Sequence, residues 1–125
     1  MKKSLGYQTT IDYYDCDAGV INSVDTVRAI LVKAAEIMKL SVVNTTIHEF
    51  SPIGISGVLV IEESHIAIHT WPEHNYVALD FFTCNERYDL TEGIKWIQEK
   101  FKAKKYRTQS SQRGFLDEIN EDESA

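Results

Sequence analysis

The chain has 125 residues, and 19 acidic against 13 basic side chains give it a formal net charge of −6. This length predicts one domain with a single core that is marginal for a deep pocket, which favours a site completed between subunits. The acidic balance argues against nucleic acid or an anionic membrane as the main partner, and with no long apolar run and no signal-peptide pattern we expect a cytoplasmic protein.

The first half of the chain predicts strand, helix and two strands. Residues 5–16 are rich in β-branched and aromatic side chains and predict a strand that ends in a turn at residues 15–19. Residues 23–39 predict an amphipathic helix, because apolar side chains recur at three-and-four spacing behind capping residues. Residues 41–50 and 57–62 are again β-branched and predict two more strands.

The second half predicts a hairpin, a helix and a last strand. The hairpin pairs residues 64–71 with 76–84, and Asp89 caps a helix with an apolar stripe of Ile94, Ile97 and Phe101. Residues 106–109 predict the last strand. Two helices on one face of a mainly antiparallel sheet make an α+β two-layer sandwich. We expect one domain over residues 1–114 and a disordered acidic tail over residues 115–125.

The hairpin carries a hydroxyl, two imidazoles and a thiol. If its loop is centred near residues 73–75, paired residue numbers sum to about 148, so Cys84 falls opposite Ser64 within about two positions. Ser64 and His69 are an odd number of residues apart, so in a regular strand their side chains point to opposite faces. For both to serve one site, Ser64 has to lie in a turn or bulge before the strand.

Two general chemistries fit these residue types poorly. His65 and His69, with His74 and Cys84 nearby, invite a zinc site, but positions four apart on a strand are roughly 13 Å from each other, so we expect no metal. A Cys84 nucleophile with His69 as its base lacks an orienting Asn or Asp that the sequence singles out. In a reducing compartment Cys84 and the distant Cys16 are expected to be free thiols.

Several short motifs lie together in the middle of the chain. They are Glu63-Ser64-His65, Ile68-His69-Thr70-Trp71-Pro72-Glu73 and Phe82-Thr83-Cys84, preceded by Phe50-Ser51-Pro52-Ile53-Gly54-Ile55-Ser56-Gly57. Together they resemble the prokaryotic S-adenosylmethionine decarboxylase proenzyme family. The resemblance extends over residues 5–114 and is densest between residues 50 and 84.

The resemblance implies a self-processing enzyme with a covalently built cofactor. Members of the family cleave themselves at a Glu-Ser bond, here Glu63–Ser64, and the serine becomes a pyruvoyl group. In the matching roles, His69 is the base for processing and Ser56 supports it. The pyruvoyl carbonyl forms a Schiff base with the substrate amine and acts as an electron sink, and Cys84 is the proton donor after decarboxylation.

The resemblance also implies a substrate pocket and a partner. Phe50 matches the residue that stacks on the adenine of S-adenosylmethionine, and Glu73 the residue that contacts the ribose hydroxyls. Trp71 and Ile66 match the walls of the adenosyl pocket. Family members pair as dimers in which each site draws residues from both protomers. The product, decarboxylated S-adenosylmethionine, is the aminopropyl donor for spermidine and polyamine biosynthesis.

Three departures from the family pattern leave another substrate open. Gly6-Tyr7-Gln8 stands where the family usually has Gly-Arg-His, Asp15 replaces a glycine before Cys16, and Asn85 replaces a glycine after the catalytic cysteine. Some related chains are pyruvoyl-dependent arginine or ornithine decarboxylases, and Asp15 adds a carboxylate that can pair with a guanidinium or an amine. Phe50 and Glu73, which are retained, favour the adenosyl substrate.

A second alternative is a protein without activity. An unprocessed relative of the family would serve as a binding or regulatory subunit. The intact set of Ser56, Ser64, His69 and Cys84 counts against this reading, because a chain without catalysis has no need of all four.

Overall fold

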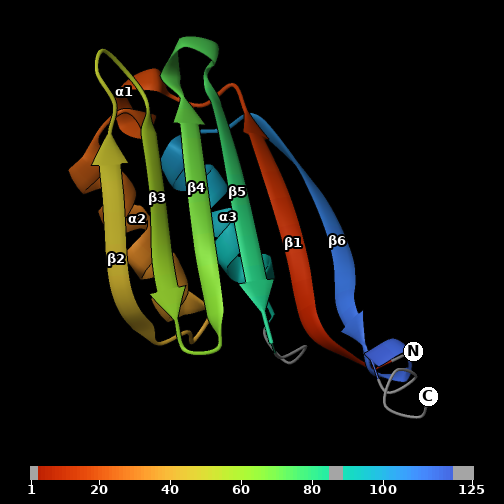
Figure 1. The fold of residues 1–125 in the computed structure, drawn as a ribbon. Helices are drawn as coiled ribbons and strands as arrows, with labels where there is room; N and C mark the ends of the chain where they lie inside the picture. The colour runs from red at the N-terminus through yellow and green to blue at the C-terminus, as the bar shows by residue number, and fades with distance from the viewer. Residues whose placement is uncertain (1–2, 85–88, 120–125) are drawn as a thin grey trace.

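In the computed structural model, residues 3–84 and 89–119 are described, and they form one six-stranded antiparallel sheet with its helices on one side (Figure 1). The elements are β1 (Ser4–Tyr14), α1 (Ala18–Ile21), α2 (Val24–Ile37), β2 (Val42–Glu49), β3 (Ile55–Ile61), β4 (Ser64–Trp71), the 3-10 turn η1 (Pro72–His74), β5 (Tyr76–Thr83), α3 (Thr91–Phe101) and β6 (Lys105–Phe115). The sheet order is β2-β3-β4-β5-β1-β6. The predicted α+β fold is therefore confirmed.

Helix α2 begins where the sequence predicts. The Ser23 hydroxyl accepts a hydrogen bond from the Thr26 amide at 3.3 Å and so satisfies one of the free donors of the first turn. The short helix α1 is an addition to the prediction, which placed a turn here. The Asp17 carboxylate caps it by accepting from the Val20 amide at 3.1 Å.

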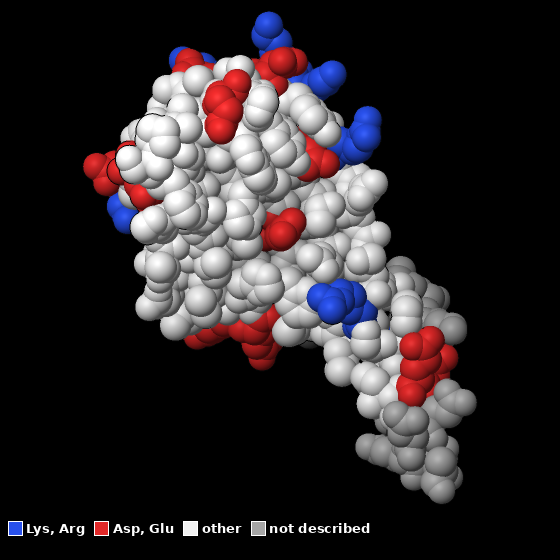
Figure 2. All heavy atoms as spheres, turned by 45° about the horizontal axis from the view of Figure 1, so that its top comes forward, with Lys and Arg blue, Asp and Glu red and all other residues white. Residues whose placement is uncertain are grey.

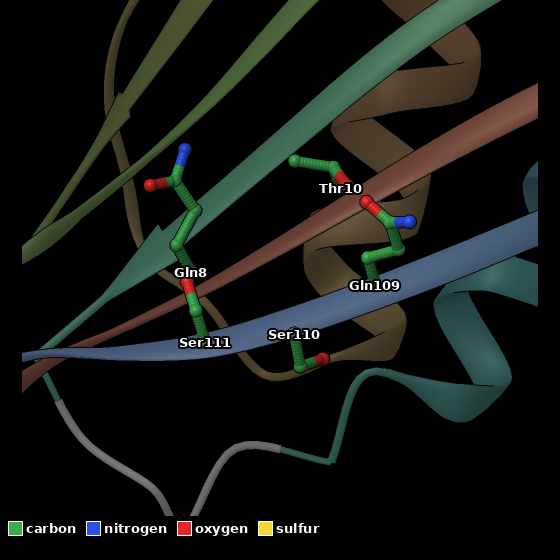
Figure 3. Close-up of a pocket in the computed structure, with 5 residues that line it drawn as sticks. All are labelled: Gln8, Thr10, Gln109, Ser110 and Ser111. Carbon is green, nitrogen blue, oxygen red and sulfur yellow. The ribbon is translucent and has the colours of Figure 1, made fainter.

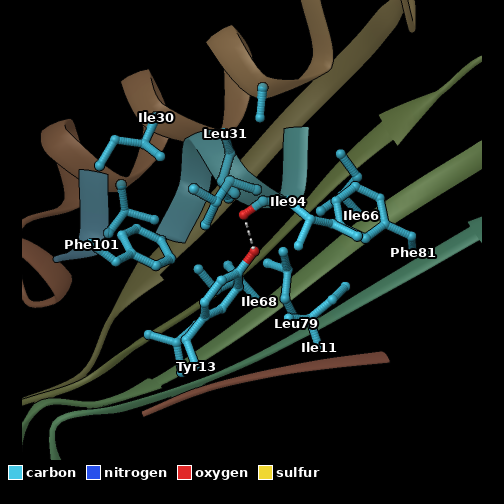
Figure 4. Close-up of a cluster of buried hydrophobic side chains, with 14 of the residues drawn as sticks. Ile11, Tyr13, Ile30, Leu31, Ile66, Ile68, Leu79, Phe81, Ile94 and Phe101 are labelled. Carbon is cyan, nitrogen blue, oxygen red and sulfur yellow. Dashed lines mark hydrogen bonds between the residues drawn. The ribbon is translucent and has the colours of Figure 1, made fainter. Parts of the chain in front are cut away.

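Helix α3 confirms the second predicted helix. The Asp89 carboxylate accepts from the Thr91 amide at 3.0 Å, and this hydrogen bond lowers the pKa of Asp89. Ile94 and Ile97 of α3 pack onto the sheet, and the Tyr13 hydroxyl of β1 donates to the Ile94 carbonyl at 2.8 Å (Figure 4). The only polar atom of the Tyr13 side chain is thereby satisfied inside the core.

The two faces of the sheet differ in what covers them. Side chains that point toward the helices are buried, including Ile66 and Ile68 of β4 and Leu79 and Phe81 of β5. The alternate side chains lie on a face that no described element covers, which we call the open face. Its members include Ser56, Val58, Val60, His65, His69, Trp71, Tyr76, Asp80, Phe82 and Gln8. In Figure 2 the middle of the displayed surface is mostly uncharged, apart from an acidic group and a basic group below it, and most other charged side chains lie toward the margins.

The last strand is longer than predicted. β6 pairs with β1 from Lys105 to Phe115, and residues 116–119 form a helical turn, where the sequence suggested the beginning of a tail. Residues 120–125 of the expected tail lie outside the described part of the chain. Among residues 3–84 and 89–119, no helix has the length and apolar character needed to cross a bilayer.

Candidate functional site

The register of the central hairpins determines which site residues become neighbours. In the pairing of β4 with β5, Ser64 lies opposite Thr83, so paired numbers sum to 147 and the predicted register is confirmed within one position. In the pairing of β3 with β4, Ile61 lies opposite Ser64 across a two-residue turn, Glu62 and Glu63. The turn thus joins directly to the first residue of β4.

Glu63, Ser64 and Cys84 meet at this end of the sheet, and we call them the Ser64 cluster. The Cys84 amide donates to the Glu63 carbonyl at 3.2 Å, and the Cys84 side chain is exposed. The Ser64 hydroxyl is buried and makes no hydrogen bond to any described residue. Glu63 has φ 61°, a left-handed conformation that costs a non-glycine residue about 1 kcal/mol. A strained peptide, a polarised carbonyl and an unpaired hydroxyl are therefore adjacent.

Ser56 and His69 form a second group, which we call the His69 pair. The two residues are opposite each other in β3 and β4, and the Ser56 hydroxyl lies 2.8 Å from Nδ1 of His69. Both side chains are on the open face, where the His69 ring also lies 6.2 Å from the Trp71 ring. The hydrogen bond fixes the orientation of the imidazole, which is the side chain best suited to accept and return a proton near neutral pH.

One protomer does not bring the two groups together. Ser64 is the first residue of β4 rather than part of a turn or bulge, and five residues of extended strand separate it from His69, about 17 Å. The two side chains also point to opposite faces of the sheet. His69 of the same chain therefore cannot reach the Glu63–Ser64 bond without breaking the strand.

Most of the residues matched to the substrate pocket lie near the His69 pair. Phe50 follows β2, Trp71 ends β4 and Glu73 lies in η1, all at the end of the sheet that carries the His69 pair, and Phe50 and Trp71 are 48% and 39% exposed. Ile66 needs a correction. It is 0% exposed and packs in the core between sheet and helices, so its side chain is not an exposed wall of a pocket.

The turn that carries Glu73 is held by Asn75, which the sequence did not single out, through hydrogen bonds to Cys16. Asn75 has φ 54°, its side-chain amide donates to the Cys16 carbonyl at 3.0 Å, and its own carbonyl accepts from the Cys16 amide at 2.8 Å. Asn is one of the few residues that adopt this conformation readily, which was an available signal. Burial, with a contribution from Asp15, raises the pKa of the Cys16 thiol to about 12, so this cysteine is structural.

An aromatic row lies next to the His69 pair. Trp71 stacks on Tyr76 at 5.3 Å, and Tyr76 stacks on Tyr14 at 5.5 Å. Burial raises the pKa of the Tyr76 phenol, and so does the hydrogen bond that it donates to Asp12. The row gives the open face a rigid apolar margin at this end.

The unusual residue Gln8 lies elsewhere on the open face. It lines a polar pocket of about 580 Å³ on β1 and β6, together with Thr10, Gln109, Ser110 and Ser111 (Figure 3). The Arg113 guanidinium donates to the Gln8 side-chain carbonyl at 3.4 Å. Asp15, the extra carboxylate, follows β1 at the other end of the sheet, and Asn85 lies outside the described residues. Among the described residues, no three His, Cys, Asp or Glu side chains are arranged to hold a metal ion.

Comparison with known proteins places the chain in a family. A family model described as S-adenosylmethionine decarboxylase matches residues 7–114. A protein of Acidithiobacillus ferrooxidans named S-adenosylmethionine decarboxylase proenzyme is 39% identical over 115 residues, 92% of this chain and 86% of the relative. A protein of the same name from Thermotoga petrophila is 40% identical over 117 residues, 94% of this chain and 90% of the relative.

A solved structure extends the likeness to three dimensions. The crystal structure of the adenosylmethionine decarboxylase from Aquifex aeolicus matches this fold with a TM-score of 0.81 at 31% identity, and the match covers 90% of this chain and 93% of that chain. The family model, the relatives and the solved structure all carry the name of the same decarboxylase. The chain belongs to the S-adenosylmethionine decarboxylase family.

Proposed function

We propose that this protein is a pyruvoyl-dependent S-adenosylmethionine decarboxylase that cleaves itself between Glu63 and Ser64. The observation that carries the proposal is the Ser64 cluster. The Ser64 hydroxyl has no hydrogen-bond partner among the described residues, and the carbonyl before it accepts a hydrogen bond from the Cys84 amide. These residues fit a pyruvoyl group, because they supply both the serine that becomes it and the activated bond that must break.

Self-processing follows from the chemistry of these groups. The Ser64 oxygen attacks the Glu63 carbonyl carbon, and the Cys84 amide stabilises the negative charge that develops on the carbonyl oxygen. The C–N bond breaks and an ester replaces the amide. A base then removes the α-proton of residue 64, and the Glu63 carboxylate leaves. The dehydroalanine that remains takes up water and loses ammonia, which gives chains of residues 1–63 and 64–125.

A second protomer supplies the base in this proposal. Within one chain His69 is about 17 Å along β4 from Ser64, so it cannot take the proton. The open face offers the surface for pairing, because Val58, Val60 and Trp71 are each at least 39% exposed on it. Two open faces packed in opposite directions would place the partner's His69 at the end of the sheet that carries the Glu63–Ser64 peptide bond, on the open-face side of the backbone.

The residues of the site also have separate roles in the decarboxylation itself. A pyruvoyl group supplies an electrophilic carbonyl that withdraws electrons from the carbon that loses carbon dioxide. The exposed Cys84 thiol, next to residue 64, returns a proton to that carbon. Phe50 offers a half-exposed ring for the adenine, and Glu73 an acceptor for the ribose hydroxyls. The decarboxylated product is an aminopropyl donor for polyamine synthesis.

The alternatives receive less support. The relatives are named for S-adenosylmethionine rather than for arginine or ornithine. A regulatory role without cleavage would leave the Ser64 cluster and the His69 pair without a purpose. Two free cysteines, one of them exposed, fit the cytoplasm as the site of action.

The test begins with the intact mass of the purified protein under denaturing conditions. We expect two chains divided between residues 63 and 64, and one uncut chain for Ser64→Ala. Release of carbon dioxide is then measured from S-adenosylmethionine, arginine and ornithine side by side. Release from S-adenosylmethionine alone supports the proposal, release from arginine or ornithine replaces the substrate, and an uncut, inactive wild-type chain refutes it.

A further inference from the structure

His48 is an exposed histidine, the last residue but one of β2, and its side chain lies on the open face. It pairs with Ser56 of β3, so His48, Ser56 and His69 occupy one row across three neighbouring strands. Two of these residues form the His69 pair. The position of His48 alone does not give it a role, but its contact with the next side chain on the same face does.

The His48 ring packs against the Phe50 ring. Their centroids are 4.6 Å apart and the ring planes meet at 74°, which is the edge-to-face geometry that aromatic pairs prefer. Because the rings are nearly perpendicular, the imidazole covers at most one face of the phenyl ring. Phe50 is still 48% exposed, so a face remains for a planar ligand.

The backbone of Phe50 is already fixed by other contacts. The Phe50 amide donates to the Gly54 carbonyl at 2.8 Å, which closes the loop after β2. The Gly54 amide in turn donates to the Asn22 side chain at 3.0 Å, which ties the loop to the segment between α1 and α2. The rotation of the Phe50 side chain is the freedom that these bonds leave, and the His48 ring restricts it.

We infer that His48 is a positioning residue of the adenosyl site, which holds the Phe50 ring in the orientation that stacks on adenine. The inference rests on the proposed function, because it takes Phe50 as the stacking residue. It predicts an effect on substrate binding and none on proton transfer, since His48 contacts Phe50 rather than the reacting atoms. A phenyl ring in place of the His48 imidazole should hold the Phe50 ring equally well.

The test uses three variants. His48→Ala removes the ring, His48→Phe keeps one, and Thr46→Ala is the matched control, because Thr46 is exposed on the same strand and face. For His48→Ala we expect full self-cleavage, a KM for S-adenosylmethionine about 2- to 10-fold higher, the size of one aromatic pair, and a kcat within about twofold. His48→Phe should restore KM, and Thr46→Ala should leave it unchanged.

A binding measurement separates this inference from the proposed function. Titration of 5′-methylthioadenosine into the same variants on a Ser64→Ala background reports the adenosyl site without cleavage or turnover. Weaker binding that His48→Phe restores supports the role of His48 even if the wild type fails to decarboxylate S-adenosylmethionine. Unchanged binding and KM in His48→Ala, an equal loss in Thr46→Ala, or a fall in kcat alone would overturn it.

Discussion

The separation of Ser64 from His69 within one chain leads to a complementation experiment. One chain carries Ser64→Ala and keeps His69, and the other carries His69→Ala and keeps Ser64. We expect neither to cleave when expressed alone, because the first has no nucleophile and the second no base. When the two are co-expressed, a mixed pair contains one complete site, formed by Ser64 of one chain and His69 of the other.

The yield follows from the pairing. With equal amounts and random association, about half of the His69→Ala chains meet a Ser64→Ala partner, so about half of them should be cut. Cleavage inside one chain is not expected, because about 17 Å of strand separates Ser64 from His69, whereas a base takes a proton over roughly 3 Å. Removal of a general base typically slows a reaction about 100- to 10,000-fold, so background cleavage should be slight.

Denaturing mass spectrometry reads the result, because residues 64–125 of the cut chain must carry the His69→Ala substitution. The control is a mixture of His69→Ala with a chain that carries both substitutions. No chain in this mixture has His69, so it should give no cut chain. Efficient cleavage of His69→Ala by itself would show that His69 is not the base. No cleavage in the mixture would show that the site is completed inside one chain.

Three other predictions concern reactivity and stability. Iodoacetamide should modify the exposed Cys84 and abolish turnover while the buried Cys16 stays unmodified, and equal rates of modification in the native protein would contradict the burial argument. Asn75→Ala should lower the free energy of unfolding in urea by about 1–2 kcal/mol, because it loses the bond to the Cys16 carbonyl and strains the left-handed backbone, and Asn75→Gly should recover part of the loss. Burial raises the pKa of Cys16 to about 12 and also raises that of Tyr13, so both groups ionise more readily in the unfolded chain. The free energy of unfolding should therefore fall from about pH 9 toward pH 12, by at most about 1.4 kcal/mol per pH unit for each group. Urea unfolding measured across this pH range checks it, and a flat profile would refute it.

Much of the fold could be predicted because local pattern and pairing agree. The alternation of apolar and polar residues in β4 and β5 determines both the strands and their register, which was correct within one position at Ser64. The same alternation places Ile66 on the core side, opposite in face to His69, although the family match implies a pocket wall at this position.

Other features depend on contacts that a sequence does not display. The edge strand β6 is polar along residues 108–112, and its strand conformation comes from pairing with β1 rather than from local propensity. The role of Asn75 depends on a hydrogen bond to Cys16, 59 positions earlier in the chain. The contact of His48 with Phe50 likewise needed coordinates, since an exposed histidine before a turn is typical of solvated positions.

If the chain is cleaved between Glu63 and Ser64 as proposed, the strand order has a consequence for the mature protein. Residues 1–63 contribute β1, β2 and β3, and residues 64–125 contribute β4, β5 and β6, yet β1 lies between β5 and β6. The two products are therefore interleaved along three seams, and neither can leave without dismantling the sheet. Cleavage also turns refolding from a reaction of one chain into an encounter of two. A mature enzyme that unfolds should recover with a rate that depends on concentration, whereas its uncut precursor folds as a single chain.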